Sequence, residues 1–145
     1  MSTTNQINKL ELAYTIFCDD VRLEVGNKLS LIGVFQNMLV QQLPVSLIKF
    51  AIVNHWRGEG RYLSEVRILS PDKKQAVVVS EPAPFEITQG GHTDNVSFFV
   101  NITFHTPGEY WVQTLINSTL FNEQPLLIMD ARSAQPPEAA SESIN

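Results

Sequence analysis

The sequence is poor in charged residues and in basic residues above all. Charged side chains make up 17% of its 145 residues, against roughly 25% in an average globular protein, which excludes a chain kept unfolded by its charge. Only 10 Lys and Arg stand against 15 Asp and Glu, so the formal net charge is −5. Because this charge does not attract a polyanion, we expect no nucleic-acid partner.

Long hydrophobic runs and a secretory leader are also missing. No stretch reaches the roughly 18 consecutive apolar residues of a membrane-spanning helix, so we expect a soluble protein with no membrane partner. Residues 1–9 lack the basic segment and cleavage site of a signal peptide. The single cysteine, Cys18, cannot form an internal disulfide. Together these features predict a cytoplasmic protein.

The sequence does contain a repeated pattern of short strands. Hydrophobic residues reach 43%, enough for a core, and apolar and polar residues alternate most clearly from 96 to 104. We expect strands at 12–18, 21–25, 29–35, 47–56, 61–69, 75–80, 96–104, 110–116 and 126–129, separated by turns rich in Gly, Pro and Asn. This pattern predicts an all-β fold, a single antiparallel β-sandwich of about eight strands with immunoglobulin-like or C2-like connections. A closed barrel is the alternative.

The two ends of the chain differ in composition from its middle. Residues 1–9 are polar, and residues 131–145 are rich in Ala, Ser, Glu and Pro. We therefore expect a flexible N-terminus over 1–9, one β-sandwich domain over 10–130 and a disordered tail over 131–145.

Two strands are predicted to open with Gly, one spacer and Tyr. Gly60 precedes Tyr62 by two positions, and Gly108 precedes Tyr110 in the same way. Glycine frees the turn, and tyrosine can bury its ring while its hydroxyl reaches the backbone. We expect a structural role for both tyrosines.

Catalytic and metal-binding patterns are weak in this sequence. The histidines stand far apart, without a partner at a spacing typical of zinc sites, at His55, His92 and His105. Cys18 shares the apolar face of its strand, which indicates a small core residue rather than a nucleophile. No motif of a hydrolase or a nucleotide-binding enzyme is present. We expect a non-catalytic protein without a metal or cofactor.

A candidate interaction surface follows from the register expected across the turn before Tyr110. If the core faces of 96–104 and 110–116 pair, Phe99 opposes Leu115 and Trp111 lies on the same outer face. Exposed apolar surface of this extent usually marks an interface. We therefore expect Phe99, Trp111 and Leu115 to form a docking surface, unless another part of the chain covers them.

A small basic ridge is expected on another strand. In residues 47–56 the apolar positions define the core face, so Lys49, His55 and Arg57 point the other way. The ridge is either a solvated sheet face or a site for an anion or an acidic partner.

Two segments near the start of the chain carry a family resemblance. They are residues 17–22, Phe-Cys-Asp-Asp-Val-Arg, and residues 26–35, Gly-Asn-Lys-Leu-Ser-Leu-Ile-Gly-Val-Phe. They resemble the opening of a family of small uncharacterised bacterial proteins. The resemblance implies a bacterial source and a β-sandwich, and it transfers no catalytic or binding residue.

These features predict a protein-interaction or self-associating module whose docking surface contains Phe99, Trp111 and Leu115. The alternative is a sandwich that binds a carbohydrate or a small anion near Lys49, His55 and Arg57. An enzyme, or a membrane module that uses calcium bound at Asp19 and Asp20, is a weaker alternative because it needs groups that the sequence does not visibly gather.

Overall fold

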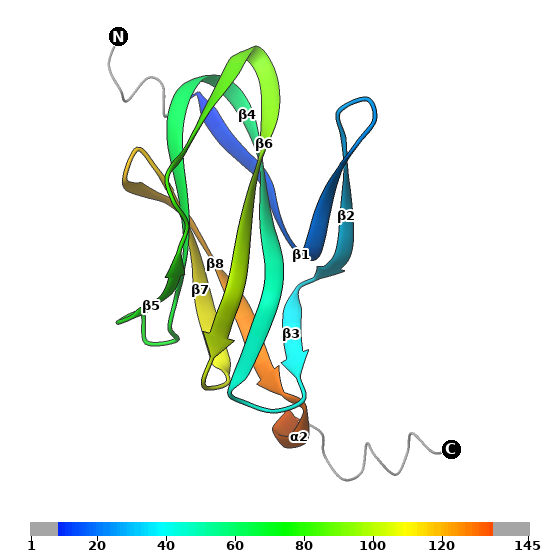
Figure 1. The fold of residues 1–145 in the computed structure, drawn as a ribbon. Helices are drawn as coiled ribbons and strands as arrows, with labels where there is room; N and C mark the ends of the chain where they lie inside the picture. The colour runs from blue at the N-terminus through cyan, green and yellow to red at the C-terminus, as the bar shows by residue number, and fades with distance from the viewer. Residues whose placement is uncertain (1–8, 135–145) are drawn as a thin grey trace.

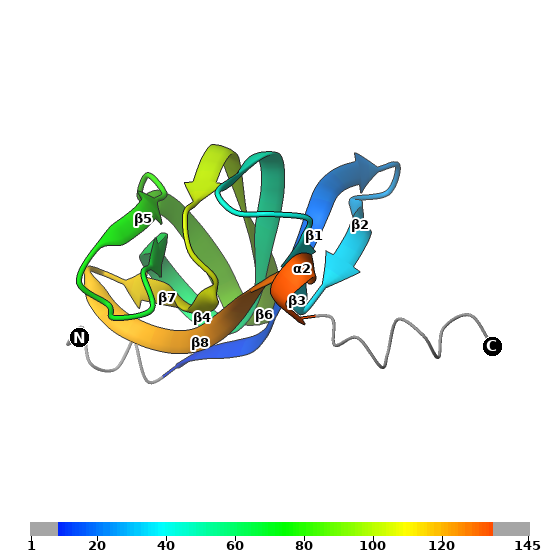
Figure 2. The same ribbon diagram turned by 90° about the horizontal axis from the view of Figure 1, so that it is seen from below.

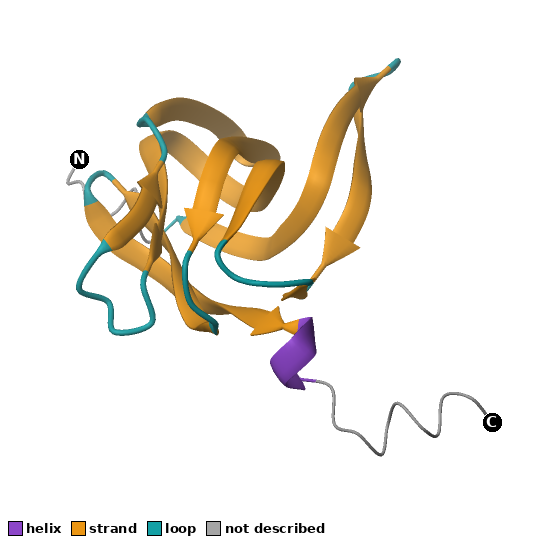
Figure 3. Ribbon diagram, turned by 60° about the horizontal axis from the view of Figure 1, so that its bottom comes forward, coloured by secondary structure: helices purple, strands orange, loops and turns teal. Residues whose placement is uncertain are grey.

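A computed structural model describes residues 9–134 as eight strands in one strongly curled sheet, followed by a single helical turn (Figure 1). This confirms the expectation of an all-β fold; nearly every described residue is strand (Figure 3). The elements are β1 (Leu10–Glu24), β2 (Lys28–Phe35), β3 (Asn37–Val40), β4 (Val45–Leu69), β5 (Ala76–Val79), β6 (Ala83–Phe104), β7 (Gly108–Ile116), β8 (Thr119–Asp130) and α2 (Ala131–Ala134).

The long strand β4 organises the sheet. Along one edge it pairs first with β1, at residues 51–58, and then with β7, at residues 64–69. Strands β5 and β6 also pair with β4, and the remaining order runs β2-β1-β4-β7-β8-β3. The register between β4 and β6 shifts at Gly58–Gly60, where both glycines have positive φ, 138° and 117°. The two predicted strands 47–56 and 61–69 are therefore one strand that changes direction at these glycines.

Because β4 bends, its two parts contribute to the same core. Phe50 and Ile52 precede the bend, Val66 and Ile68 follow it, and all four belong to the largest buried cluster. Figure 2 shows the sheet curled around this interior. A second cluster surrounds the fully buried Trp56, whose indole nitrogen donates to Asn95 Oδ1 at 2.8 Å.

The expectation of a purely antiparallel arrangement fails at one strand pair. Residues 37–40 form β3, which the sequence did not predict, and β3 pairs with β8 in parallel. Strands β2 and β3 lie at opposite ends of this strand order, and Gln36 alone connects them. The chain therefore enters β3 from β2 and not through a hairpin from β8. Such a crossover connection permits parallel pairing.

The predicted hairpin between 96–104 and 110–116 is also wrong. Strand β6 pairs with β4, while β7 pairs with β4 and β8. Phe104 and Tyr110 still meet, with ring centroids 5.0 Å apart. The apolar faces of β6 and β7 face each other across the core and are not neighbours in one ladder. Both arrangements are compatible with the same alternation of apolar and polar residues.

The structural role predicted for the two tyrosines is confirmed. Tyr62 and Tyr110 are both buried. The Tyr62 hydroxyl donates to the carbonyl of Glu59, and the Tyr110 hydroxyl donates to the carbonyl of Thr106 at 2.7 Å. Tyr62 thus holds the bend within β4, and Tyr110 closes the turn that precedes β7.

The ends of the chain are described only in part. Residues 131–134, the start of the expected tail, form α2. The expected flexible residues 1–8 and the remainder of the tail, 135–145, lie outside the described residues. Across residues 9–134, no helix is long and apolar enough to cross a membrane.

The bend in β4 generates a stability prediction. A Cβ atom at Gly58 would overlap the backbone carbonyl of Lys9, whereas a Cβ at Gly90, which also has positive φ, would meet no atom. We expect Gly58→Ala to lower the free energy of unfolding by about 3 kcal/mol or more, because a backbone clash adds to the strain of positive φ. Urea denaturation measures the change.

Gly90→Ala is the matched control for backbone strain alone, with an expected loss of roughly 1 kcal/mol. Equal losses in the two variants would contradict a close approach between β1 and the bend of β4.

Candidate functional site

The three residues predicted as a docking surface do not share one. Phe99 is buried, 2% exposed, and its ring stacks on Phe50 at 5.4 Å. Leu115 is 8% exposed, and Trp111 is half-buried on the same outward side of β7. The structure therefore buries both Leu115 and Phe99 and leaves Trp111 partly exposed, so the predicted docking surface is wrong.

The position of Phe99 has a local backbone cause. Asn101 adopts a positive φ of 53°, which interrupts the alternation of β6. Ile102 and Phe104 face the core after this point, as predicted, but Phe99 faces it before, so Phe98 and Val100 are exposed instead. A single residue in the left-handed region reverses the predicted face of the first part of the strand.

The outward face around Trp111 is a connected row of polar side chains. Lys73 Nζ lies 4.3 Å from the centre of the Trp111 ring and 2.9 Å from Glu123 Oε1. Gln113 donates to Glu123 Oε2 at 2.6 Å and accepts from Arg67. Hydrogen bonds from Gln113 and then Lys73 lower the pKa of Glu123. These groups satisfy one another and cover the indole.

The predicted basic ridge is divided and largely neutralised. Lys49 donates to Asp20 Oδ1 at 2.9 Å, and this bond is the main reason that the pKa of Asp20 is lowered. His55 Nδ1 lies 2.6 Å from Asp94 Oδ1. The buried residues Ala51 and Val53 separate Lys49 from His55 on this face.

Arg57, the third residue of the ridge, is exposed and lies opposite His92. The ring of His92 is 5.2 Å from that of His55, and His55 also stacks on Tyr14 at 4.8 Å. Within residues 9–134, no group of three metal-binding side chains is close enough to hold an ion. The arrangement is a paired His–Asp contact within an aromatic stack, without an array of free cations.

The main exposed feature is the hairpin of residues 20–35, which we call the ribbon. The sequence predicts its strands, 21–25 and 29–35, and a tight turn at Gly26–Asn27, and their pairing is confirmed; the sequence did not predict that the hairpin is exposed. It comprises the end of β1, a turn and β2, and Figures 1 and 3 show it projecting away from the rest of the sheet. None of its large apolar side chains is buried. They are Val21, Leu23, Val25, Leu29, Leu31, Ile32, Val34 and Phe35.

The outer edge of the ribbon is unpaired. Among the described strands β2 pairs with β1 alone, so half of its backbone N–H and C=O groups face outward. Leu23 is 71% exposed and Val25 is 94% exposed. Between Leu29 and Phe35 the strand has no charge and no proline to block pairing. The ribbon is therefore our candidate site, an edge that can accept another strand.

The predicted core role of Cys18 is confirmed. Its side chain is fully buried with Ala51 and Val53. Burial, and then the nearby charge of Asp19, raise the pKa of the thiol. The thiol is therefore poorly suited to act as a nucleophile.

The comparisons with known proteins identify a family for this chain but no function. Residues 13–129 match the model of a family of unknown function, DUF6941. This confirms the resemblance to a family of uncharacterised proteins. No curated protein matches the sequence.

Part of one solved structure has a similar arrangement of strands. The alkylpurine DNA glycosylase AlkC of Pseudomonas fluorescens aligns with a TM-score of 0.53 and 8% identity over 83% of this chain, which spans only 30% of the glycosylase. At this identity the likeness shows the fold alone.

Two further structures align with lower scores. A β-glucosidase of Listeria innocua aligns with a TM-score of 0.49 and 8% identity over 83% of this chain and 16% of its own. An immunoglobulin-like protein of Pseudomonas aeruginosa aligns with 0.40 and 14% identity, over 82% of this chain and 95% of its own.

The burial of Cys18 generates a test of its reactivity. We expect dithionitrobenzoate to modify the native thiol at least about 100-fold more slowly than the thiol of the denatured chain, because reaction requires local or global opening. The rate of thionitrobenzoate release measures this. Rapid modification of the folded protein would show that Cys18 is accessible and reactive.

Proposed function

We propose that this chain, which belongs to the family of unknown function DUF6941, is a non-catalytic interaction module that associates through the ribbon. One observation carries the proposal: eight apolar side chains on a projecting hairpin, none of them buried, lie beside an unpaired strand edge. A two-stranded hairpin is marginally stable alone in water. An added strand would supply backbone hydrogen bonds to the edge and cover apolar side chains.

The partner that we propose is a second copy of the chain. A two-fold axis near Leu31 pairs two β2 strands antiparallel and brings the same apolar residues together from both copies. Lys28 is the only charged residue of β2, and the axis places the two Lys28 side chains at opposite ends of the pair. No like charges face each other between the two β2 strands.

The absence of catalysis is part of the proposal. The His–Asp pair of His55 and Asp94 is the contact in the described chain that most resembles catalytic machinery. Within residues 9–134, no hydrogen bond joins His55 to a serine, threonine or cysteine that it could activate. The pairing of Lys49 with Asp20 likewise favours a structural role for the basic ridge over an anion site.

We further propose that the curled sheet is a β-sandwich with immunoglobulin-like connections and that the protein acts in the bacterial cytoplasm. The shared core of the two parts of β4 supports the first statement. The lone, buried thiol of Cys18 is compatible with a reducing compartment.

The ribbon predicts a dimer that charge can dissociate. Ile32 and Val34 are 39% and 58% exposed, so their replacement should not disturb the core. In the dimer centred on Leu31, Ile32→Lys with Val34→Lys would bring a new lysine opposite Lys28 of the second copy. We expect the dissociation constant to rise at least about tenfold, which corresponds to about 1.4 kcal/mol. Light scattering after gel filtration measures the mass at several concentrations.

Leu120→Lys is the matched control because Leu120 is 50% exposed and lies on β8, away from the ribbon. It should remain dimeric, and thermal melting should show all variants folded. A wild-type protein that stays monomeric at high concentration would refute self-association. A dimer that survives the double substitution would show that a different surface is used.

A further inference from the structure

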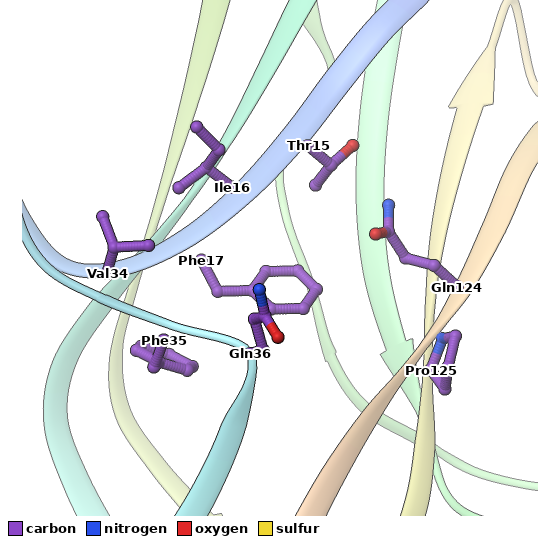
Figure 4. Close-up of a pocket in the computed structure, with 8 residues that line it drawn as sticks. All are labelled: Thr15, Ile16, Phe17, Val34, Phe35, Gln36, Gln124 and Pro125. Carbon is purple, nitrogen blue, oxygen red and sulfur yellow. The ribbon is translucent and has the colours of Figure 1, made fainter.

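A small pocket opens between β1, the start of the β2–β3 connection and β8 (Figure 4). Its volume is about 220 Å³, below the roughly 300–1,000 Å³ of sites for drug-sized ligands, so it suits one small ring or side chain. Figure 4 shows side chains from all three segments around it. Those used in the argument are Thr15, Phe17, Phe35, Gln36, Gln124 and Pro125.

The pocket lining is polar but uncharged. Phe17, Phe35 and Pro125 provide apolar surface, and Gln36 and Gln124 provide carboxamides. No Asp, Glu, Lys, Arg or His lines the pocket among the described residues. A charged ligand would lose hydration here without gaining a counter-charge, so the lining favours an uncharged ligand.

Both carboxamides are available for a ligand. Within residues 9–134, neither Gln36 nor Gln124 has a side-chain hydrogen bond to another protein group. Each carboxamide can donate two hydrogen bonds and also accept through its oxygen. Glutamines on either side of an apolar surface therefore offer both kinds of group to one ligand.

The hydroxyl of Thr15 is held in place from inside the protein. It donates to Asn54 Oδ1 at 2.5 Å, and Asn54 Nδ2 donates to Thr114 Oγ1 at 3.2 Å. Asn54 and Thr114 are buried, and buried polar groups are costly unless they are hydrogen-bonded. Because its proton is committed to Asn54, the Thr15 oxygen, which lines the pocket, can act there only as an acceptor through its lone pairs.

We propose that this pocket binds the ring of an uncharged sugar. A sugar ring carries C–H groups that pack on aromatic and proline surfaces, and its hydroxyls both donate and accept hydrogen bonds. The fixed acceptor of Thr15 and the two carboxamides match those hydroxyls, while Phe17, Phe35 and Pro125 match the C–H groups. The pocket shares Val34 and Phe35 with the ribbon, but β1 and β8 form its other sides, and the proposal does not rest on the proposed dimer.

Saturation-transfer NMR on the full chain tests the proposal with D-glucose, D-galactose and N-acetylglucosamine as probes, and D-glucuronate as the charged comparison. We expect transfer from at least one neutral sugar, with a dissociation constant in the millimolar range, and weaker transfer from glucuronate. The combination of Gln36→Ala and Gln124→Ala should weaken binding at least about tenfold, because it removes the neutral hydrogen bonds of both carboxamides.

Gln75→Ala is the matched control, since Gln75 is exposed in the turn before β5. It should bind as the wild type does. The proposal is overturned if none of the neutral sugars shows transfer at tens of millimolar, if glucuronate binds as well as they do, or if the double glutamine variant binds unchanged. Gel filtration of the same variants separates this result from the proposed dimer, whose mass should not change.

Discussion

The change of direction of β4 at Gly58–Gly60 is the constraint on which the rest of the structure depends. The backbone carbonyl of Lys9 lies against Gly58, where the Cβ atom of any other residue would overlap it. The absence of a side chain therefore allows β1 to begin next to the bend. The two parts of β4 then face one interior, and one strand supplies both Ile52 and Ile68 to a single core. The fold thus encloses its core by bending a long strand rather than by connecting separate short ones.

This way of closing the core leaves strand edges without partners. Each part of β4 has strands on both sides, but among the described strands β2, β3, β5 and β6 each pair with one strand only. The ribbon extends past the last buried residue of β1, Cys18. Val21, Leu31 and Phe35 at its base still pack against the buried clusters, but Leu23, Val25, Ile32 and Val34 are exposed. An edge of this kind favours association with another strand, and this is why the proposed function rests on the ribbon.

Features set by local sequence were predictable. The strands, the two tyrosine turns and the buried Cys18 each follow from alternation or from a short motif. The partners of β6 and β7 were not predictable, because the apolar faces of these two strands meet equally well side by side or across a core. The positive φ of Asn101 has no signal in the sequence pattern. Strand β3 has only four residues, which is too short for its alternation to be recognised.

The candidate sites were hidden for a related reason. Apolar residues of the ribbon have the composition of a core strand, and only the three-dimensional structure shows that none of them is buried. The pocket combines Thr15 with Gln124, which are far apart in sequence and meet through tertiary structure. Conversely, alternation predicted that Phe99 is exposed, and the reversal at Asn101 places it in the core.

Amide hydrogen exchange of β2 in dilute and concentrated protein tests the central claim most directly. If two copies pair through this edge, the outward-facing amides of residues 29–35 become protected as concentration rises, while those of β4 keep the same exchange rates. Exchange in β2 that is fast and independent of concentration would contradict pairing through the ribbon.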